Sequence, residues 1–197
     1  VLAARTLFMN DSGAGFVNSI ENLPEEMRRT DHYVMSSLLA DFNGDGLADP
    51  VLFWGDEIDA LDPWPARIAL SDTQKPSAEW PVQSLPTGPF GLGSTKFNHA
   101  ASADIDGDGD LDIVIGTTRA GNLYYVGRFI QILRNDGSGS FTDISQEAMG
   151  DQPRALNYED PEVEVACTVW GEGQVVLLDI DNDGDIDITD RTHGGAN

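Results

Sequence analysis

Short apolar runs alternate along the chain with acidic, glycine-rich stretches. The runs Val51-Leu-Phe-Trp54 and Ile113-Val-Ile115 each follow such a stretch, while Leu38-Leu39 and Val175-Val-Leu-Leu178 each precede one. Runs of this length that are rich in β-branched and aromatic residues predict β-strands. Each acidic stretch is therefore expected to join the two strands of a hairpin.

A second hairpin pattern indicates that the chain is built from repeats. Residues 129–142, which read as a strand, a glycine-rich turn and the start of another strand, match residues 4–17 with an offset of 125. Residues 66–72 match the first strand of this hairpin with an offset of 62. The repeated unit is thus about 63 residues long, a period that is typical of repeat folds.

The acidic stretches give the same period independently. Asp41 and Asp104, which open the first two stretches, are 63 positions apart. Asp179 opens the third stretch 75 positions after Asp104, which implies an insertion of about a dozen residues within 148–172. Two unrelated landmarks therefore define one repeat.

Each full unit reads as a strand, an acidic loop, a strand, a long loop, a strand, a short turn and a strand. Four strands in sequential antiparallel order form a meander, which is the blade of a β-propeller. The predicted fold is all-β, a β-propeller of four-stranded antiparallel blades, present as two full blades plus two half blades. The expected boundaries are the end of a blade at 1–20, blades at 35–85 and 90–147, an inserted loop at 148–172, and the start of a blade at 173–197.

The acidic stretch at 104–112 has the spacing of a calcium loop. It places aspartate at positions 1, 3, 5, 7 and 9 and glycine at positions 4 and 6. Ca²⁺ takes six to eight oxygen ligands, and the glycines let the chain curl so that alternate carboxylates converge. An EF-hand would need glutamate at position 12 and flanking helices, whereas position 12 is Leu52, Ile115 or Asp190 in the three stretches.

The pattern recurs at 41–49 and 179–187, so we predict three Ca²⁺ sites. The expected side-chain ligands are Asp41, Asn43, Asp45 and Asp49; Asp104, Asp106, Asp108 and Asp112; and Asp179, Asp181, Asp183 and Asp187. Position 7 is expected to bind through its backbone carbonyl, in Leu47, Asp110 and Asp185. The first loop, with asparagine at position 3, has one charge fewer among these side chains and is expected to bind more weakly.

Composition narrows the range of partners. The 197 residues carry a net charge of −23 and one cysteine, Cys167. The three loops hold 13 of the 34 acidic residues, and three bound Ca²⁺ ions would offset six charges. The remaining negative charge disfavours binding to nucleic acid and anionic membranes. The sequence contains no run of 18 apolar residues, the length that would predict a membrane-spanning helix. One cysteine excludes an internal disulfide and a cysteine-based zinc site.

The motifs resemble those of the FG-GAP or VCBS repeat β-propellers, which include the head of integrin α subunits and many secreted bacterial and fungal proteins. The resemblance rests on Phe90-Gly91 ahead of the second loop, on Leu111-Asp-Ile-Val-Ile-Gly116 after it, and on Asn135-Asp-Gly-Ser-Gly-Ser-Phe141. It implies an extracellular or cell-surface location. Such propellers usually close with about six to eight blades, so we expect a missing chain remainder or a second copy to complete the ring.

The resemblance also implies ligand binding on the face opposite the calcium loops. We expect that face to receive long loops, including 55–65 and 118–128, and long loops on a rigid scaffold commonly carry binding sites. Their aromatic and cationic side chains suit sugar rings or acidic groups. The candidate ligand-binding residues are Trp64, Arg119, Tyr124 and Tyr125.

Three classes of function remain open at this stage. The leading hypothesis is a noncatalytic extracellular binding or adhesion module for a glycan or a protein, in which Ca²⁺ stabilises the fold. The first alternative is a polysaccharide-active enzyme, because some lyases resemble this propeller. The second is a structural scaffold in an extracellular assembly. No motif demands catalysis, so we assign no catalytic residue.

Overall fold

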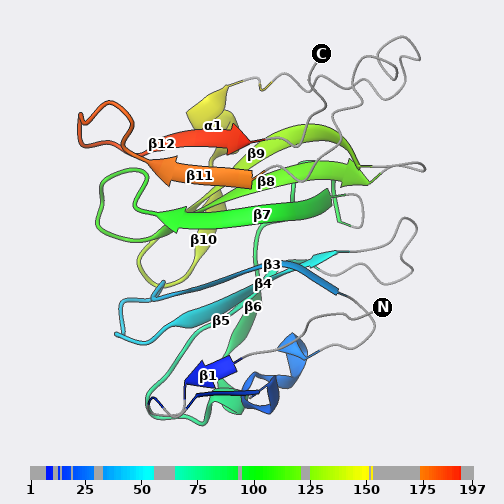
Figure 1. Ribbon diagram of the computed structural model, residues 1–197, viewed down its shortest axis with the longest axis vertical. Coiled ribbons are helices and arrows are strands. Elements are labelled where there is room, and N and C mark those ends of the chain that lie inside the picture. The colour runs from blue at the N-terminus through cyan, green and yellow to red at the C-terminus, as the bar shows by residue number, and fades with distance from the viewer. Residues whose placement is uncertain are drawn as a thin grey trace.

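The computed structural model describes residues 8–10, 13, 15–18, 20–28, 33–55, 65–92, 95–120, 125–150, 152 and 174–191. Over these residues the chain is folded mainly as antiparallel β-sheet (Figure 1). The described helical segments are short: η1 (Ile20–Asn22), η2 (Glu25–Met27), η3 (Ser77–Glu79) and α1 (Ser145–Met149). None of them is long and apolar enough to cross a membrane.

Two four-stranded sheets form the centre of the structure, and each is an antiparallel meander. The first sheet has the order β3 (Tyr33–Ala40), β4 (Asp49–Gly55), β5 (Arg67–Ala69) and β6 (Val82–Ser84). The second sheet contains, in sequential order, β7 (Thr95–Ala103), β8 (Asp112–Ala120), β9 (Tyr125–Asn135) and β10 (Phe141–Asp143). These sheets confirm the all-β class and the four-stranded antiparallel units. Closure into a propeller stays a prediction.

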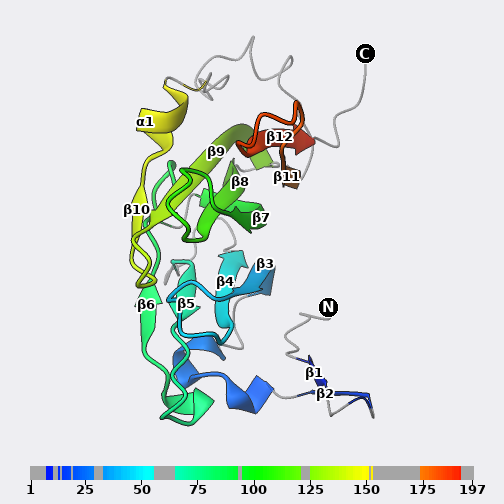
Figure 2. The ribbon, with the colours of Figure 1, turned by 90° about the vertical axis from the view of Figure 1, so that its left-hand side faces the viewer.

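Two hairpins accompany the four-stranded sheets. The N-terminal hairpin pairs β1 (Phe8–Asn10) with β2 (Phe16–Asn18), and the third sheet pairs β11 (Gln174–Leu178) with β12 (Asp187–Arg191). The first, second and third sheets are stacked in chain order (Figure 1). The strands β3, β7 and β11 lie along one side of this stack, and β6 and β10 lie along the other (Figure 2).

The stack is held together by apolar side chains between neighbouring sheets. Phe53 of β4 and Phe97 of β7 meet between the first and second sheets, with ring centroids 5.7 Å apart. Val175 of β11 is buried with Val114 and Ile132 of the second sheet. Each such side chain contributes about 1.5–3 kcal/mol when fully buried. The core between the first two sheets comprises Phe42, Val51, Phe53, Ala66, Ile68, Leu85, Phe97, Ala100, Ile113, Ile115 and Leu133.

The strands β3 and β7 carry an irregularity at equivalent places in the repeat. The pairing register shifts between Val34 and Ser36 in β3, and between Phe97 and His99 in β7. A β-bulge of this kind adds one residue to a strand and increases its local twist. Next to the bulges the two strands are joined by a hydrogen bond from Ala100 N to Ser36 Oγ, 3.2 Å long.

The prediction of a loop at 118–128 is partly wrong, because β8 extends to Ala120 and β9 begins at Tyr125. Arg119 pairs with Val126 and Ala120 pairs with Tyr125. β-Branched and aromatic residues near both strand ends favour this extended pairing. The connection between the two strands is therefore shorter than expected, and Arg119 and Tyr125 lie at strand ends.

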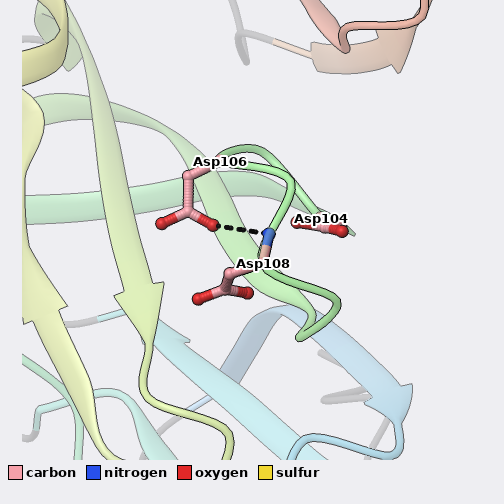
Figure 3. Close-up of side chains that lie close together, drawn as sticks. All are labelled: Asp104, Asp106 and Asp108. Atoms are coloured by element: carbon pink, nitrogen blue, oxygen red, sulfur yellow. Dashed lines mark hydrogen bonds between the residues drawn. The ribbon is translucent and has the colours of Figure 1, made fainter.

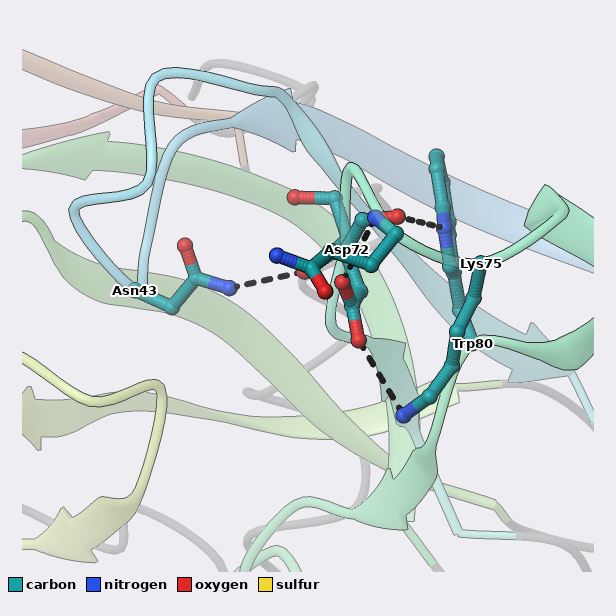
Figure 4. Close-up of polar contacts among 6 residues, drawn as sticks. Asn43, Asp72, Lys75 and Trp80 are labelled. Carbon is teal, nitrogen blue, oxygen red and sulfur yellow. Dashed lines mark hydrogen bonds and ion pairs between the residues drawn. The ribbon is translucent and has the colours of Figure 1, made fainter.

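The short turn expected between the last two strands of the first unit is also wrong. Residues 70–81 separate β5 from β6 and include η3. Pro76 and Pro81 lack the N–H that pairing in a sheet requires. The segment is instead held by polar contacts between its own residues. Trp80 Nε1 donates to Asp72 O at 3.2 Å, and Lys75 Nζ lies 3.1 Å from Asp72 Oδ2 (Figure 4).

Candidate metal centre

The three acidic loops lie at one end of the sheet stack. They connect β3 to β4, β7 to β8 and β11 to β12, and Figure 1 shows all three on the same side. The reason is topological, because stacked meanders with equivalent strand directions place equivalent hairpin turns at the same end. Strands β4 and β8 end, and β5 and β9 begin, at the opposite end.

The second loop is wound around its first aspartate. Asp104 accepts hydrogen bonds from Gly107 N at 2.8 Å and from Gly109 N at 3.0 Å, using both carboxylate oxygens. Gly107 and Gly109 have φ values of 74° and 96°, which side chains other than glycine rarely adopt. Asp106 Oδ1 accepts from Asp108 N at 3.3 Å. Side-chain to backbone hydrogen bonds therefore form the curl that the spacing predicted.

This curl brings carboxylates together in two of the loops. Asp104, Asp106 and Asp108 each offer an oxygen within 4.8 Å of the others, and the three side chains lie close together in Figure 3. Asp179, Asp181 and Asp187 form a second such group. Like charges this close repel one another unless a cation lies among them. All the donors are hard oxygens, so they fit Ca²⁺ or Mg²⁺ and disfavour soft metals.

The aspartate at position 9 braces the first two loops. Asp112 is 1% exposed, and its carboxylate accepts from Ile105 N at 2.9 Å and from Asn135 N at 2.8 Å. Asp49 is 0% exposed and accepts in the same way from Phe42 N at 2.8 Å and Ser71 N at 2.6 Å. Each carboxylate thus ties its loop to the end of the third strand of the same sheet or to the second residue after that strand.

Burial and hydrogen bonding act in opposite directions on Asp112. Burial raises the pKa of its carboxyl, and the nearby Asp106 and Asp108 carboxylates raise it further. The N–H groups of Asn135 and Ile105 lower this pKa, but burial is the larger effect, so the net direction is upward. The carboxylate is therefore kept in place by directed donors rather than by solvation.

The third loop combines both arrangements. Asp187 Oδ2 accepts from Ile180 N at 2.9 Å, as the equivalent aspartates do in the other loops. Asp187 also belongs to the converging group with Asp179 and Asp181. Gly184 N donates to Asp179 Oδ2 at 3.0 Å. Position 9 can therefore brace a loop and face the other carboxylates of that loop.

The first loop is braced more heavily by protein groups. Asn43 occupies position 3, and its Nδ2 donates to Ser71 O at 3.2 Å (Figure 4). Ser71 Oγ donates to Asp45 Oδ1 at 3.1 Å. In the part of the chain that the structure describes, the two groups of three converging carboxylates lie in the second and third loops. Ser71 thus engages two predicted ligands of the first loop, accepting from Asn43 and donating to Asp45.

The backbone N–H groups at position 7 are also engaged. Leu47, Asp110 and Asp185 donate to the aspartate two residues earlier, at 2.8, 2.9 and 3.0 Å. Their carbonyl ligation stays a prediction. Sequence reasoning missed Ser71 and Asn135, which brace Asp49 and Asp112. The available signals were the place of each residue at or near the end of an apolar strand and, for Asn135, its position in the motif at 135–141.

The candidate residues for ligand binding at the other end are only partly placed. Trp64 and Tyr124 lie outside the described residues. Arg119 and Tyr125 belong to β8 and β9, where they pair with Val126 and Ala120 and not with each other. Their side chains lie outside the described part, so their role stays a prediction.

Part of the chain matches a known protein family. Residues 104–189, which run from the first aspartate of the second loop into β12, match the family model described as FG-GAP-like repeat. No curated protein and no solved structure matches the chain. The match covers two of the three acidic loops and the strands β8 to β11. Over residues 104–189, the chain therefore matches the FG-GAP-like repeat, the family that its loop and turn motifs resemble.

Proposed function

We propose that this chain is part of a calcium-stabilised β-propeller that serves as an extracellular binding or adhesion module. The observation that carries the proposal is the convergence of Asp104, Asp106 and Asp108, and of Asp179, Asp181 and Asp187, to within 4.8 Å. Both groups lie in loops at one end of the sheet stack. This arrangement leaves the other end for a ligand, and the FG-GAP-like repeat supports the assignment.

Calcium suits these loops better than magnesium. Each loop offers several carboxylate oxygens and one backbone carbonyl on a curled backbone, which matches the six to eight oxygens that Ca²⁺ takes at flexible distances. Mg²⁺ requires near-ideal octahedral geometry and retains several waters. The proposed ligands in all three loops are those predicted from the spacing. The cation would neutralise carboxylates and fix the hairpin turns.

Calcium removal tests this role. A ligand that binds only the folded chain stabilises it by about 2.7 kcal/mol at a hundredfold excess over its dissociation constant. For a chain of this size, this corresponds to a rise in melting temperature of about 5–11 °C per site. We expect calorimetric melting in Ca²⁺ to exceed that in chelator, with a smaller rise in Mg²⁺. An unchanged melting temperature would show that the loops do not stabilise the fold through calcium.

We place ligand recognition at the end opposite the acidic loops, with no bond breaking. The connections from β4 to β5 and from β8 to β9 come from equivalent positions of adjacent sheets, so their side chains can line one groove. Trp64, Tyr124 and Tyr125 supply aromatic surface for stacking on sugar rings or on a peptide side chain. Arg119 supplies a positive charge for acidic groups.

A glycan and matrix-protein array tests this placement. We expect the Trp64→Ala, Tyr125→Ala double variant to lose the binding of the unmodified chain. Trp80→Phe is the matched control, because Trp80 lies in the 70–81 connection at the acidic-loop end of the first sheet. Binding retained by the double variant would remove the proposed site. Cleavage of a uronic-acid polysaccharide by the unmodified chain would contradict a noncatalytic role.

A further inference from the structure

One buried side chain contacts two acidic loops from neighbouring sheets. Asn135 ends β9 and is 2% exposed. Its Nδ2 donates to Phe42 O in the first loop at 2.7 Å and to Leu111 O in the second loop at 3.1 Å. Its backbone N donates to Asp112 at 2.8 Å. The orientation of this one amide therefore depends on both loops.

The turn that follows Asn135 is fastened to the first sheet. Gly139 N donates to Asn135 Oδ1 at 3.0 Å, which fixes the amide group. Phe141 packs edge-on against Phe42, with ring centroids 5.6 Å apart and an interplanar angle of 72°. Gln83 of β6 donates a side-chain hydrogen bond to Gly139 O. The turn thus cannot move without disturbing the first loop.

The same turn lies against the second loop. A Cβ atom added to Gly137 would be 2.4 Å from Asp110 Oδ2, so the aspartate at position 7 is in close contact with the turn. A Cβ atom on Gly139 would be 2.4 Å from Leu70 Cδ2 of the first sheet. Close packing transmits displacement because protein interiors have little free volume. The turn at 135–141 is therefore closely packed between the second loop and the residue that follows β5 of the first sheet.

Ser71, which makes the same backbone contact beside the first sheet, has a different side-chain contact. Ser71 N donates to Asp49 as Asn135 N donates to Asp112. However, Ser71 Oγ donates to Asp45 in its own loop. The contact with a neighbouring loop thus depends on the longer amide side chain of Asn135. Serine at this position is compatible with the fold of such a sheet, which makes it a useful substitution.

We propose that Asn135 couples the first and second loops, so that a cation in one raises the affinity of the other. This inference rests on the proposed calcium binding. A cation in the second loop fixes Leu111 and Asp112, which orients Asn135 and holds Phe42 O in the first loop. Couplings between sites are typically 5–150-fold and are reciprocal. With one amide as the link, we expect a change of about fivefold.

Nuclear magnetic resonance can test this coupling loop by loop. The amide signals of Gly44 and Gly46 report the first loop, and those of Gly107 and Gly109 report the second. The full chain carries Asp181→Ala to remove the third site and is titrated with Ca²⁺. Adding Asp106→Ala, which removes an exposed ligand of the second loop, should raise the dissociation constant of the first loop about fivefold.

The substitution Asn135→Ser should abolish this difference, so that the first loop binds equally with the second loop intact or removed. Asn98→Ser is the matched control, because Asn98 is a buried asparagine of β7 whose Nδ2 donates to Thr118 and not to a loop; the fivefold difference should persist there. In chelator, hydrogen exchange at Gly44 and Gly46 should quicken in Asn135→Ser but not in Asn98→Ser.

The outcomes separate this inference from the proposed function. If the first loop binds Ca²⁺ equally well with and without Asp106→Ala, the coupling is wrong while calcium binding stands. If no loop of the unmodified chain binds Ca²⁺, the proposed function is wrong and the coupling fails with it. Should Asn135→Ser not fold, the comparison with and without Asp106→Ala still decides whether the two loops are coupled, because it leaves Asn135 in place.

Discussion

Two aspartates of the second loop should affect stability under different conditions when each is changed to alanine. Asp112 is buried and accepts two backbone N–H groups, from Ile105 and Asn135. Asp106 is exposed, and its one described hydrogen bond, from Asp108 N, is 3.3 Å long. Both were predicted as calcium ligands. We expect Asp112 to stabilise the fold without any cation and Asp106 to stabilise it only when a cation is bound.

The magnitude follows from the hydrogen bonds lost. A buried donor left without an acceptor costs about 1–3 kcal/mol. In Asp112→Ala, the buried Asn135 N–H would lose its acceptor at the full free-energy cost. The Ile105 N–H is partly buried, so losing its acceptor would cost less. The expected loss in chelator is about 2–4 kcal/mol, or roughly 4–16 °C in melting temperature. Asp106→Ala should change stability in chelator by no more than about 0.5 kcal/mol.

The assay is thermal unfolding of both variants, each in chelator and in excess Ca²⁺. Asp106→Ala should match the unmodified chain in chelator and lose the calcium-induced rise of the second loop. Asp112→Ala should melt early under both conditions. Asp112→Asn is the isosteric control, which keeps one acceptor and should fall between them. Equal melting temperatures for Asp106→Ala and Asp112→Ala in chelator would refute the bracing role of position 9.

Three further predictions follow from local geometry. The first loop should bind Ca²⁺ roughly tenfold more weakly than the second, equivalent to about 1.4 kcal/mol of binding free energy. The reasons are that its predicted side-chain ligands carry one charge fewer and that Ser71 already donates a hydrogen bond to Asp45. Calorimetry that ranks the first loop tighter would contradict this order. Gly139→Ala, at a φ of 82° and facing Leu70, should cost about 1–3 kcal/mol in urea unfolding, more than Gly91→Ala at a φ of 85° in open space. The hydrogen bond from the Ser138 side chain, and then that from its backbone N–H, lower the pKa of Asp136. The stabilisation that the Asp136 carboxylate gives the fold is therefore present above the ordinary aspartate pKa and is lost as pH falls through the lowered value. A titration by nuclear magnetic resonance in which Ser138→Ala leaves the pKa of Asp136 unchanged would contradict the assignment.

The repeat and the strand order could be predicted because each is encoded locally. The glycine and aspartate spacing of the loops predicts tight turns, and the apolar runs on either side predict strands. Two independent landmarks with one period then indicate stacked units. The all-β class and the four-stranded sheets were therefore accessible without coordinates.

The remaining features depend on contacts between distant residues. The bracing role of Asp112 requires Asn135 N, which lies 23 positions away, and Asn135 in turn contacts Phe42, 93 positions away. No spacing rule assigns such partners. The long connection at 70–81 had a local signal, since Pro76 and Pro81 disfavour a strand. This proline signal was overridden by the assumption that the first unit has the same short turn as the second unit.

The bulges of β3 and β7 have a consequence for how such repeats change through gene duplication, insertion and deletion. The regular pairing resumes on both sides of the extra residue Asn98, with Phe97 opposite Thr117 and His99 opposite Gly116, so the bulge accommodates one residue without changing these partners. Phe97 thereby keeps its contact with Phe53 of the neighbouring sheet. Strands β3 and β7 thus share this extra residue at equivalent positions, whereas the connection between the last two strands spans 70–81 in one unit and only 136–140 in the next. Lineages descended from one ancestral unit should accumulate length differences at that connection and retain the extra strand residue.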